Sequence, residues 1–322
     1  MKALSETRTW PLRLELGRLH VLILLFILEL ALFGALKPAY LSLAGLLDAS
    51  RAFVEAGLLA LGMTLVIITG GIDLSVASLL ALVSVSIGFS SAAGLPLPLA
   101  LVFGLLVGVL GGLLNGLIVA ALDLHPLVVT LGTMALFRGL AYAVTNANAV
   151  STFPDWFAFI GQAYLWDLFP FQLIVWLIAV VAIWILLTKT SFGRYVYGLG
   201  INERATRFSG VNVFAVKLGV YILSGFFAAI AAIIQTSRVF TARANAATGL
   251  ELTVIAMVAL GGTRITGGSG SILGTTLGVL ILAYLQDGLV FVGVRNDWAL
   301  VLTGIVLVLT VFANEFFRKE RR

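Results

Sequence analysis

A glycine pair and a carboxylate separate two long apolar runs near the start of the chain. The stretch 70–75 reads GGIDLS and lies between apolar segments at 52–69 and 74–93. Backbone that leaves helical geometry inside a membrane is tolerated only where it packs against protein or lines a watery cavity, and an ionised group there is costly. The pattern therefore predicts a helix break. Asp73 either faces a translocation pathway or caps the next helix with help from Ser75.

A related pattern recurs in the last third of the chain. Gly261, Gly262 and Thr263 open a second stretch rich in glycine and hydroxyl groups, and it also stands between two apolar runs. Gly261 follows Gly70 at a spacing of 191 residues. This spacing predicts two pseudo-repeated halves, each with one helix break.

Two further polar residues, Asn115 and Arg138, lie inside apolar runs and join the candidate pathway residues. Arg138 either reaches the external interface with its long side chain or pairs with a carbonyl group. The ionisable residues Asp73 and Arg138 also leave open an ion-coupled secondary carrier. Glycines at small-xxx-small spacing, such as Gly104 and Gly108, favour close helix packing and leave open a membrane scaffold without transport.

The composition indicates an all-α polytopic membrane protein. Hydrophobic residues make up 61% of the 322 residues and charged residues 11%, with a mean hydropathy of +1.11, whereas soluble domains carry about 25% charged residues. The apolar runs are continuous over about 20 residues, the length that crosses a bilayer as a helix, and lack the alternation of barrel strands. About ten transmembrane helices are predicted, at 19–36, 52–69, 74–93, 97–122, 127–145, 171–188, 213–237, 251–262, 272–292 and 298–316.

Lysine and arginine residues set the predicted orientation. With a cytoplasmic N-terminus, thirteen of them fall in cytoplasmic segments and five in external segments, as the positive-inside rule requires. Both termini are therefore predicted in the cytoplasm, with an N-terminal segment at 1–18, a transmembrane domain at 19–316 and a basic tail at 317–322. This distribution accounts for the net charge of +5 without a nucleic-acid partner. The external loop at 146–170 is either a cap with interfacial aromatic residues or a docking surface.

The loop at 189–212 is the sizeable polar connection predicted on the cytoplasmic side. Asn202 is an expected N-cap, residues 203–208 are an expected short helix, and Gly210 is its expected end. Such a helix either presses into a groove on a partner or simply joins two spans.

Several kinds of chemistry are absent from the sequence. No GxxxxGK[ST] loop is present, so the chain has no nucleotide-binding loop of that type. The chain has no Cys, and its two histidines, His20 and His125, stand in no metal-ligand spacing. We therefore expect no enzyme activity, no metal site and no cofactor bound by this chain.

Four motifs in order make the chain resemble the membrane-spanning permease subunits of ribose-type (monosaccharide) ATP-binding-cassette importers. They are the stretch 70–75, the stretch 129–133 with Arg138-Gly139, the stretch 200–210, and the stretch 260–274. The family usually has Gly where this chain has Ala77, and two alanines where it has Ala205-Thr206. Within the family, the stretches 27–34 and 284–289 are most similar to the autoinducer-2 and rhamnose branch.

The resemblance implies an importer in the bacterial inner membrane with two permeases, two cytoplasmic ATPases that use ATP and Mg, and an external sugar-binding protein. The solute would be ribose, rhamnose, another monosaccharide or autoinducer-2, and the second permease either a copy or a paralogue. Export remains open, because spans and orientation do not encode direction. The implied ATPase-coupling residues are Asn202, Glu203, Arg204, Ala205, Thr206, Arg207, Ser209 and Gly210. The implied residues of the pathway or helix breaks are Gly70, Gly71, Asp73, Ser75, Asn115, Arg138, Gly261, Gly262 and Thr263.

Overall fold

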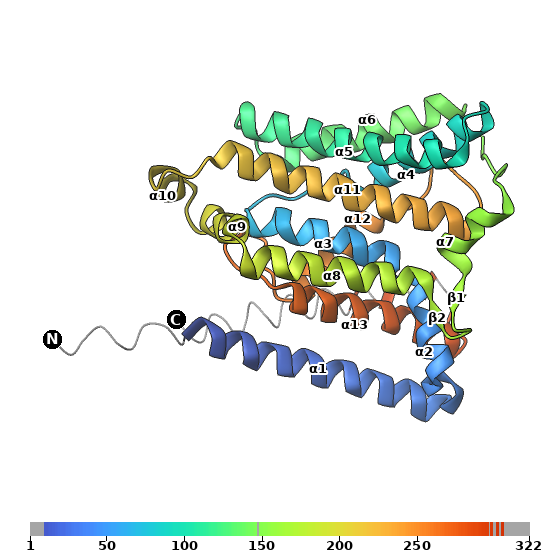
Figure 1. Ribbon diagram of the computed structural model, residues 1–322. Helices are drawn as coiled ribbons and strands as arrows, with labels where there is room; N and C mark the ends of the chain where they lie inside the picture. The colour runs from blue at the N-terminus through green and yellow to red at the C-terminus, as the bar shows by residue number, and fades with distance from the viewer. Residues whose placement is uncertain (1–9, 147, 296, 299–300, 303, 306–322) are drawn as a thin grey trace.

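The computed structural model describes residues 10–146, 148–295, 297–298, 301–302 and 304–305. This part is helical apart from one short hairpin, as the composition predicts (Figure 1). The tenth predicted span, at 298–316, falls largely outside the described residues, and the predicted tail at 317–322 falls wholly outside them.

The helices and strands follow one another from α1 to α13. Their order is α1 (Trp10–Leu36), η1 (Pro38–Leu41), α2 (Leu43–Ala49), η2 (Ser50–Ala52), α3 (Val54–Ile68), α4 (Val76–Ala92), α5 (Leu97–Ala121), α6 (Pro126–Thr145), η3 (Asp155–Phe157), α7 (Ala158–Gln162), β1 (Tyr164–Leu165), β2 (Phe169–Pro170), α8 (Phe171–Lys189), α9 (Ser191–Ile201), α10 (Glu203–Phe208), α11 (Val213–Val239), α12 (Leu250–Leu260) and α13 (Ile272–Phe291).

Six helices of the described part are long and apolar enough to cross a membrane, namely α1, α5, α6, α8, α11 and α13. A seventh candidate is the bent pair of the segment 43–52 with α3, which meet at 60°. Each remaining predicted span up to 292 coincides with a helix, but α4 and α12 have only 17 and 11 residues. Among the described residues, helix length thus supports six or seven crossings, because α4 and α12, which adjoin the glycine breaks, are shorter than a span. The first helix also begins at Trp10, before the predicted start at 19.

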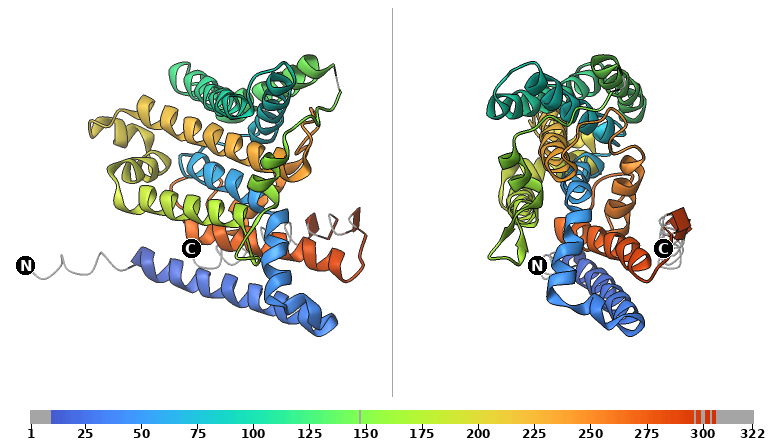
Figure 2. Two further views of the ribbon diagram at one scale, coloured as in Figure 1. Left: turned by 45° about the vertical axis from the view of Figure 1, so that its right-hand side comes forward. Right: turned by 90° about the vertical axis from the view of Figure 1, so that its right-hand side faces the viewer.

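Helix α3 forms the centre of the bundle. All of its residues from Val54 to Ile68 are buried, and α8, α11, α12 and α13 pack around it. Figure 2 shows the remaining long helices arranged around this centre, with α1 at one edge against α13. A helix that is apolar on all sides is expected where protein surrounds it completely.

Glycines allow α5 and α11 to pack at backbone distance. A Cβ on Gly112 would overlap the carbonyl oxygen of Tyr221, and one on Gly225 would overlap that of Gly108. Close approach of this kind is what drives helix association in lipid, where burial of apolar surface contributes little. The predicted role of the small-xxx-small glycines is confirmed for this pair of helices.

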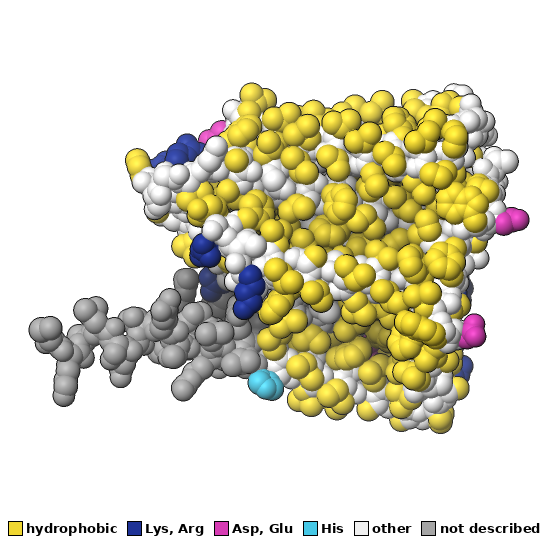
Figure 3. All heavy atoms as spheres, in the orientation of Figure 1, with side chains coloured by type: hydrophobic (Ala, Val, Ile, Leu, Met, Phe, Trp, Pro, Cys, Tyr) yellow, Lys and Arg dark blue, Asp and Glu magenta, His cyan; other side chains and the backbone are white. Residues whose placement is uncertain are grey.

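The two ends of the bundle differ. Helix α10 and the start of α1 lie at one end, and the hairpin β1–β2 lies at the other (Figure 1). Hydrophobic side chains cover most of the visible face between the ends, and Lys and Arg side chains gather toward the end with α10 (Figure 3). On this face, charged side chains therefore lie at the ends of the bundle, and a band of hydrophobic side chains lies between them.

The segment predicted as the long external loop is ordered around η3, α7 and the hairpin. Tyr164 in β1 hydrogen-bonds to Asp48, and the Arg51 guanidinium donates to the Tyr164 hydroxyl over 2.6 Å. Partial burial and the Asp48 carboxylate raise the pKa of Tyr164 above its usual value. Beneath this segment the buried Glu55 carboxylate pairs with Arg238 at 2.7 Å. The described part of the loop is thus fixed to the bundle.

Candidate functional site

The first glycine break closes α3 with a Schellman motif. The amide of Gly70 donates to Ile67 over 2.9 Å, and that of Gly71 donates to Val66 over 3.0 Å. Gly70 has a φ of 85°, a left-handed conformation that glycine adopts without steric cost. This closure satisfies two carbonyl groups at the end of a wholly buried helix.

The second break repeats this closure. The amide of Gly262 donates to Ala259 over 2.9 Å, and that of Thr263 donates to Val258 over 3.3 Å, with a φ of 90° at Gly262. Gly262, and not Gly261, is therefore the counterpart of Gly70. The sequence paired Gly70 with Gly261, which is wrong by one residue. The two breaks are equivalent at their left-handed glycines, and these are Gly70 and Gly262.

The two breaks are in direct backbone contact. Gly268, which follows the second break, donates its amide to the carbonyl of Ile68 over 2.9 Å. A Cβ on Gly267 would lie 2.9 Å from the Cα of Gly70. Gly200, the penultimate residue of α9, fits against the same point, since a Cβ there would overlap the Ile68 carbonyl. Three distant segments therefore converge at the end of α3.

Asp73 lies in a buried polar cluster between the helices. Its Oδ1 accepts from the amide and hydroxyl of Ser75, at 3.0 and 2.6 Å, and its Oδ2 accepts from the Ser224 hydroxyl at 2.9 Å. Asn115 donates to the Ser75 hydroxyl over 2.7 Å, and all four residues are at most 1% exposed. Asp73 and Ser75 thus form an Asx-type turn just before α4. The side-chain cap expected for this helix is not formed, because its N-cap residue Ser75 makes no side-chain cap hydrogen bond.

Thr130 connects this cluster to α6. Its hydroxyl donates to the carbonyl of Ile72 over 2.9 Å. Two polar atoms nearby, Asn115 Oδ1 and the Tyr221 hydroxyl, are buried without a hydrogen-bond partner. Tyr221 lies against the break, because its hydroxyl would be 2.8 Å from a Cβ on Gly71.

Arg138, in the second half of α6, binds backbone carbonyl groups. One of its guanidinium nitrogens donates to the carbonyls of Ala244 and Ala246, at 2.6 and 2.8 Å. The carbonyl-pairing alternative for this residue is therefore confirmed. Asp73 and Arg138 therefore both bond to backbone or to neighbouring hydroxyl groups.

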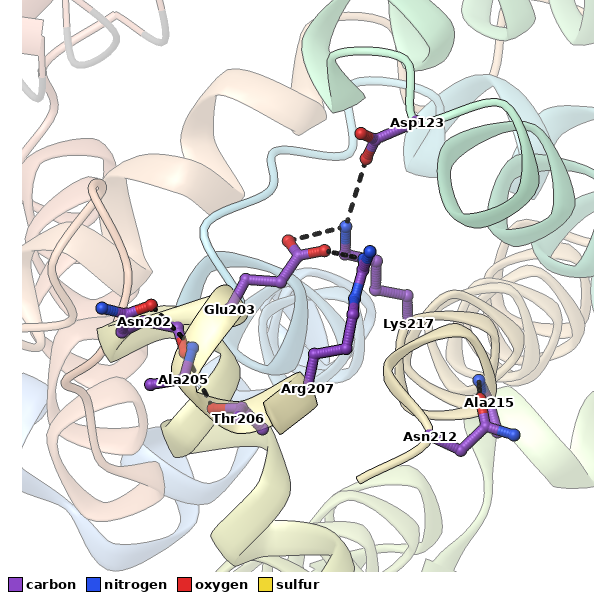
Figure 4. A network of polar contacts seen from close by, with 9 residues as sticks. All are labelled: Asp123, Asn202, Glu203, Ala205, Thr206, Arg207, Asn212, Ala215 and Lys217. Carbon is purple, nitrogen blue, oxygen red and sulfur yellow. Dashed lines mark hydrogen bonds and ion pairs between the residues drawn. The ribbon is translucent and has the colours of Figure 1, made fainter. Parts of the chain in front are cut away.

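The short helix expected in the 189–212 loop is confirmed as α10 (Figure 4). Asn202 accepts the amide of Ala205 at 3.0 Å, which is an N-cap, and Gly210 follows the helix with a φ of 82°. The sequence reasoning missed α9, whose N-cap is Thr190. A Ser or Thr cap before an apolar periodic segment was the available signal.

A network of charges joins α10 to the rest of the bundle. Glu203 pairs with Arg207 on the same helix at 2.9 Å and with Lys217 of α11 at 2.8 Å. Lys217 also lies 3.9 Å from Asp123 in the α5–α6 turn (Figure 4). The sequence placed Lys217 inside a span and did not connect it with this site, because the contact joins segments far apart in the chain.

The remaining residues of α10 divide into those that bond within the helix and those that face outward. Thr206 and Ser209 donate to the carbonyls of Asn202 and Ala205. Arg204 is exposed, as is Phe208 at 91%. Ile201, the last residue of α9, is also exposed, at 73%. Exposed aromatic and apolar side chains at a polar end are typical of a surface that a partner covers.

A cavity of about 240 Å³ lies between α10 and the first break. Its walls include Gly70, Gly71, Asp123, Glu203, Lys217 and Tyr221. Among the described residues, no three His, Asp or Glu side chains gather in an arrangement that could hold a metal ion.

Comparison with known proteins identifies the family. The family model for the permease component of the branched-chain amino acid transport system matches residues 45–311. The ribose import permease protein of Bacillus subtilis (strain 168) is 41% identical over 292 residues, which cover 90% of this chain and 90% of the relative.

Two autoinducer 2 import system permease proteins are also similar. The protein of Klebsiella pneumoniae is 38% identical over 309 residues, covering 94% of this chain and 93% of the relative. That of Escherichia coli (strain K12) is 35% identical over 306 residues, covering 93% and 92%. No solved structure matches the chain significantly. The chain therefore belongs to this family of transport-system permease components, as a ribose-type ATP-binding-cassette permease that lacks an ATP site of its own.

Proposed function

We propose that this chain imports a sugar or sugar-like solute across the bacterial inner membrane, driven by a cytoplasmic ATPase that docks on α10. The observation that carries the proposal is the exposed surface of α10 and the end of α9, where the capped helix α10 presents Arg204 and Phe208 and α9 ends in the exposed Ile201. The relatives named for ribose and autoinducer-2 give the two solute classes to test first.

The proposed orientation puts α10 in the cytoplasm. The excess of Lys and Arg on that side supports it, and the start of α1 at the same end agrees with a cytoplasmic N-terminus. Ten crossings in two pseudo-repeated halves, with a cytoplasmic C-terminus, remain our proposal. The repeated Schellman closure at Gly70 and Gly262 supports the two halves.

The partners are proposed from the family. Two ATPase subunits would bind ATP and Mg, a second permease copy or a paralogue would complete the membrane part, and an external solute-binding protein would deliver the cargo. The surface at the end opposite α10 suits that protein, because Trp166 and Trp156 are exposed there at 82% and 49%. Aromatic side chains are common anchors of protein interfaces.

Copurification with the cognate ATPase tests the docking surface. Phe208→Asp places a charge at the centre of the proposed contact and should abolish ATPase association while membrane insertion is unchanged. Trp166→Asp, with a similarly exposed aromatic residue at the other end, should keep ATPase association. Retention of the ATPase by the Phe208 variant, or equal loss in both variants, would reject α10 as the docking helix.

A further inference from the structure

Lys217 joins the coupling helix α10 to a second segment of the bundle. Its Nζ lies 2.8 Å from Glu203 Oε2 at the start of α10 and 3.9 Å from Asp123 Oδ1 in the turn between α5 and α6. The Lys217 side chain is only 14% exposed. The pair with the half-buried Glu203 is therefore the shorter and better shielded of the two contacts, and Asp123, which is 88% exposed, makes the longer and more solvent-screened one.

The contact continues from the α5–α6 turn to the first glycine break. Asp123 precedes Pro126, the first residue of α6. One turn further along α6, the Thr130 hydroxyl donates to Ile72, the residue before Asp73. Movement of the α5–α6 turn would therefore be transmitted along α6 to the first glycine break, through the hydrogen bond from Thr130 to Ile72.

A second connection runs along α11. Tyr221 lies one turn after Lys217 on that helix, and its buried hydroxyl is directed at Gly71. Glu203, Lys217 and Tyr221 line the same 240 Å³ cavity as Gly70 and Gly71. A displacement of α10 would thus reshape a cavity that borders the break.

We propose that Lys217 is a positioning residue that transmits movement of α10 to the α5–α6 turn and so to the glycine break. The proposal rests on the proposed docking of an ATPase on α10. The role proposed for Lys217 is separate from docking, because its side chain is only 14% exposed and contacts Glu203 and Asp123 and not the exposed surface of α10. Loss of Lys217 should therefore separate ATPase binding from the conformational response.

The chain has no cysteine, so a single Leu124→Cys substitution provides a specific reporter beside Asp123. Leu124 is 47% exposed. The assembled complex with the cognate ATPase would be labelled with a maleimide with and without ATP and vanadate, and the labelling rate of this chain measured. Lys217→Met, Lys217→Arg and Arg194→Met would be compared on this background. Arg194 is the matched control, since its guanidinium bonds to Ser191 within α9.

We expect the ATP-dependent change in labelling rate to persist in the parent, Lys217→Arg and Arg194→Met proteins and to disappear in Lys217→Met, with the ATPase still bound. Persistence in Lys217→Met, or equal loss in Arg194→Met, would overturn the proposal. If Lys217→Met does not fold, Asp123→Asn removes the charge contact from the side of the α5–α6 turn and carries the same expectation. An ATPase that never binds the parent protein would instead contradict the proposed function.

Discussion

The amide nitrogen of Gly268 donates a 2.9 Å hydrogen bond to the carbonyl oxygen of Ile68, which brings the two glycine breaks into backbone contact. Gly200 of α9 packs against the same carbonyl. The segment 189–212, which carries α10, is thereby attached to both breaks. A permease that converts movement at its surface into a change at its passage requires such an attachment.

Substitution of Gly200 tests this convergence. Gly200→Val would drive a side chain into the Ile68 carbonyl and Gly268, and overpacking of this kind costs about 1–3 kcal/mol. We expect a lower melting temperature of the detergent-purified protein. Gly132→Ala is the control, because a Cβ there meets nothing within 4 Å. Equal melting temperatures for the Gly200 variant and the parent would argue against the contact.

The Asp73 cluster gives a prediction that separates a structural role from a pathway role. Asp73→Ala would leave the donors of Ser75 and Ser224 without an acceptor, at about 1–3 kcal/mol for a buried unpaired group. Asp73→Asn keeps one acceptor oxygen and should be less destabilising. Thermal unfolding measures the difference. An Asp73→Ala protein with parental stability and no transport would assign Asp73 to the pathway.

The N-cap of α10 should contribute to ATPase binding. Asn202→Ala removes the acceptor for the Ala205 amide, and loss of an N-cap costs about 1 kcal/mol of helix stability. The affinity for the ATPase should fall accordingly in a titration. Asn212→Ala removes a cap of the same geometry from α11 and should leave this affinity unchanged. A fall of similar size for both variants would contradict a specific role of α10.

Arg138 should order the segment before α12. Arg138→Met removes both hydrogen bonds to the carbonyls of Ala244 and Ala246. Hydrogen exchange across 241–249 should become faster, because those carbonyls lose their fixed donor. Arg243→Met, which removes a nearby exposed cation, should leave exchange at its parental rate. Unchanged exchange in the Arg138 variant would mean that other contacts hold this segment.

Much of the fold follows from local sequence signals. Apolar runs located the long apolar helices of the described part but not α9. Asn202 and Gly210 delimited α10, because caps and left-handed glycines act within a few residues. Hydropathy did not reveal that α3 is wholly buried, since an apolar side chain suits lipid and protein interior equally.

The contacts of the candidate site could not be predicted from the sequence, because they join residues that are far apart in the chain. Nothing local to Lys217 indicates that Glu203 and Asp123 lie beside it, and nothing local to Gly268 indicates Ile68. The sequence did identify the polar residues of the first break, but it could not choose between capping and a pathway for Asp73. Its carboxylate accepts hydrogen bonds from Ser75 and from Ser224 of α11, which favours a structural role for Asp73.

ATP-driven solute uptake distinguishes an ATP-powered importer from an ion-coupled carrier. The chain would be reconstituted in proteoliposomes with its ATPase and solute-binding protein, and uptake of ribose and of autoinducer-2 measured with ATP or with a proton gradient. We predict uptake of one solute that requires ATP and both partners and that is lost in the Phe208→Asp variant. Uptake by the chain alone, driven by the proton gradient without ATPase, would contradict the account.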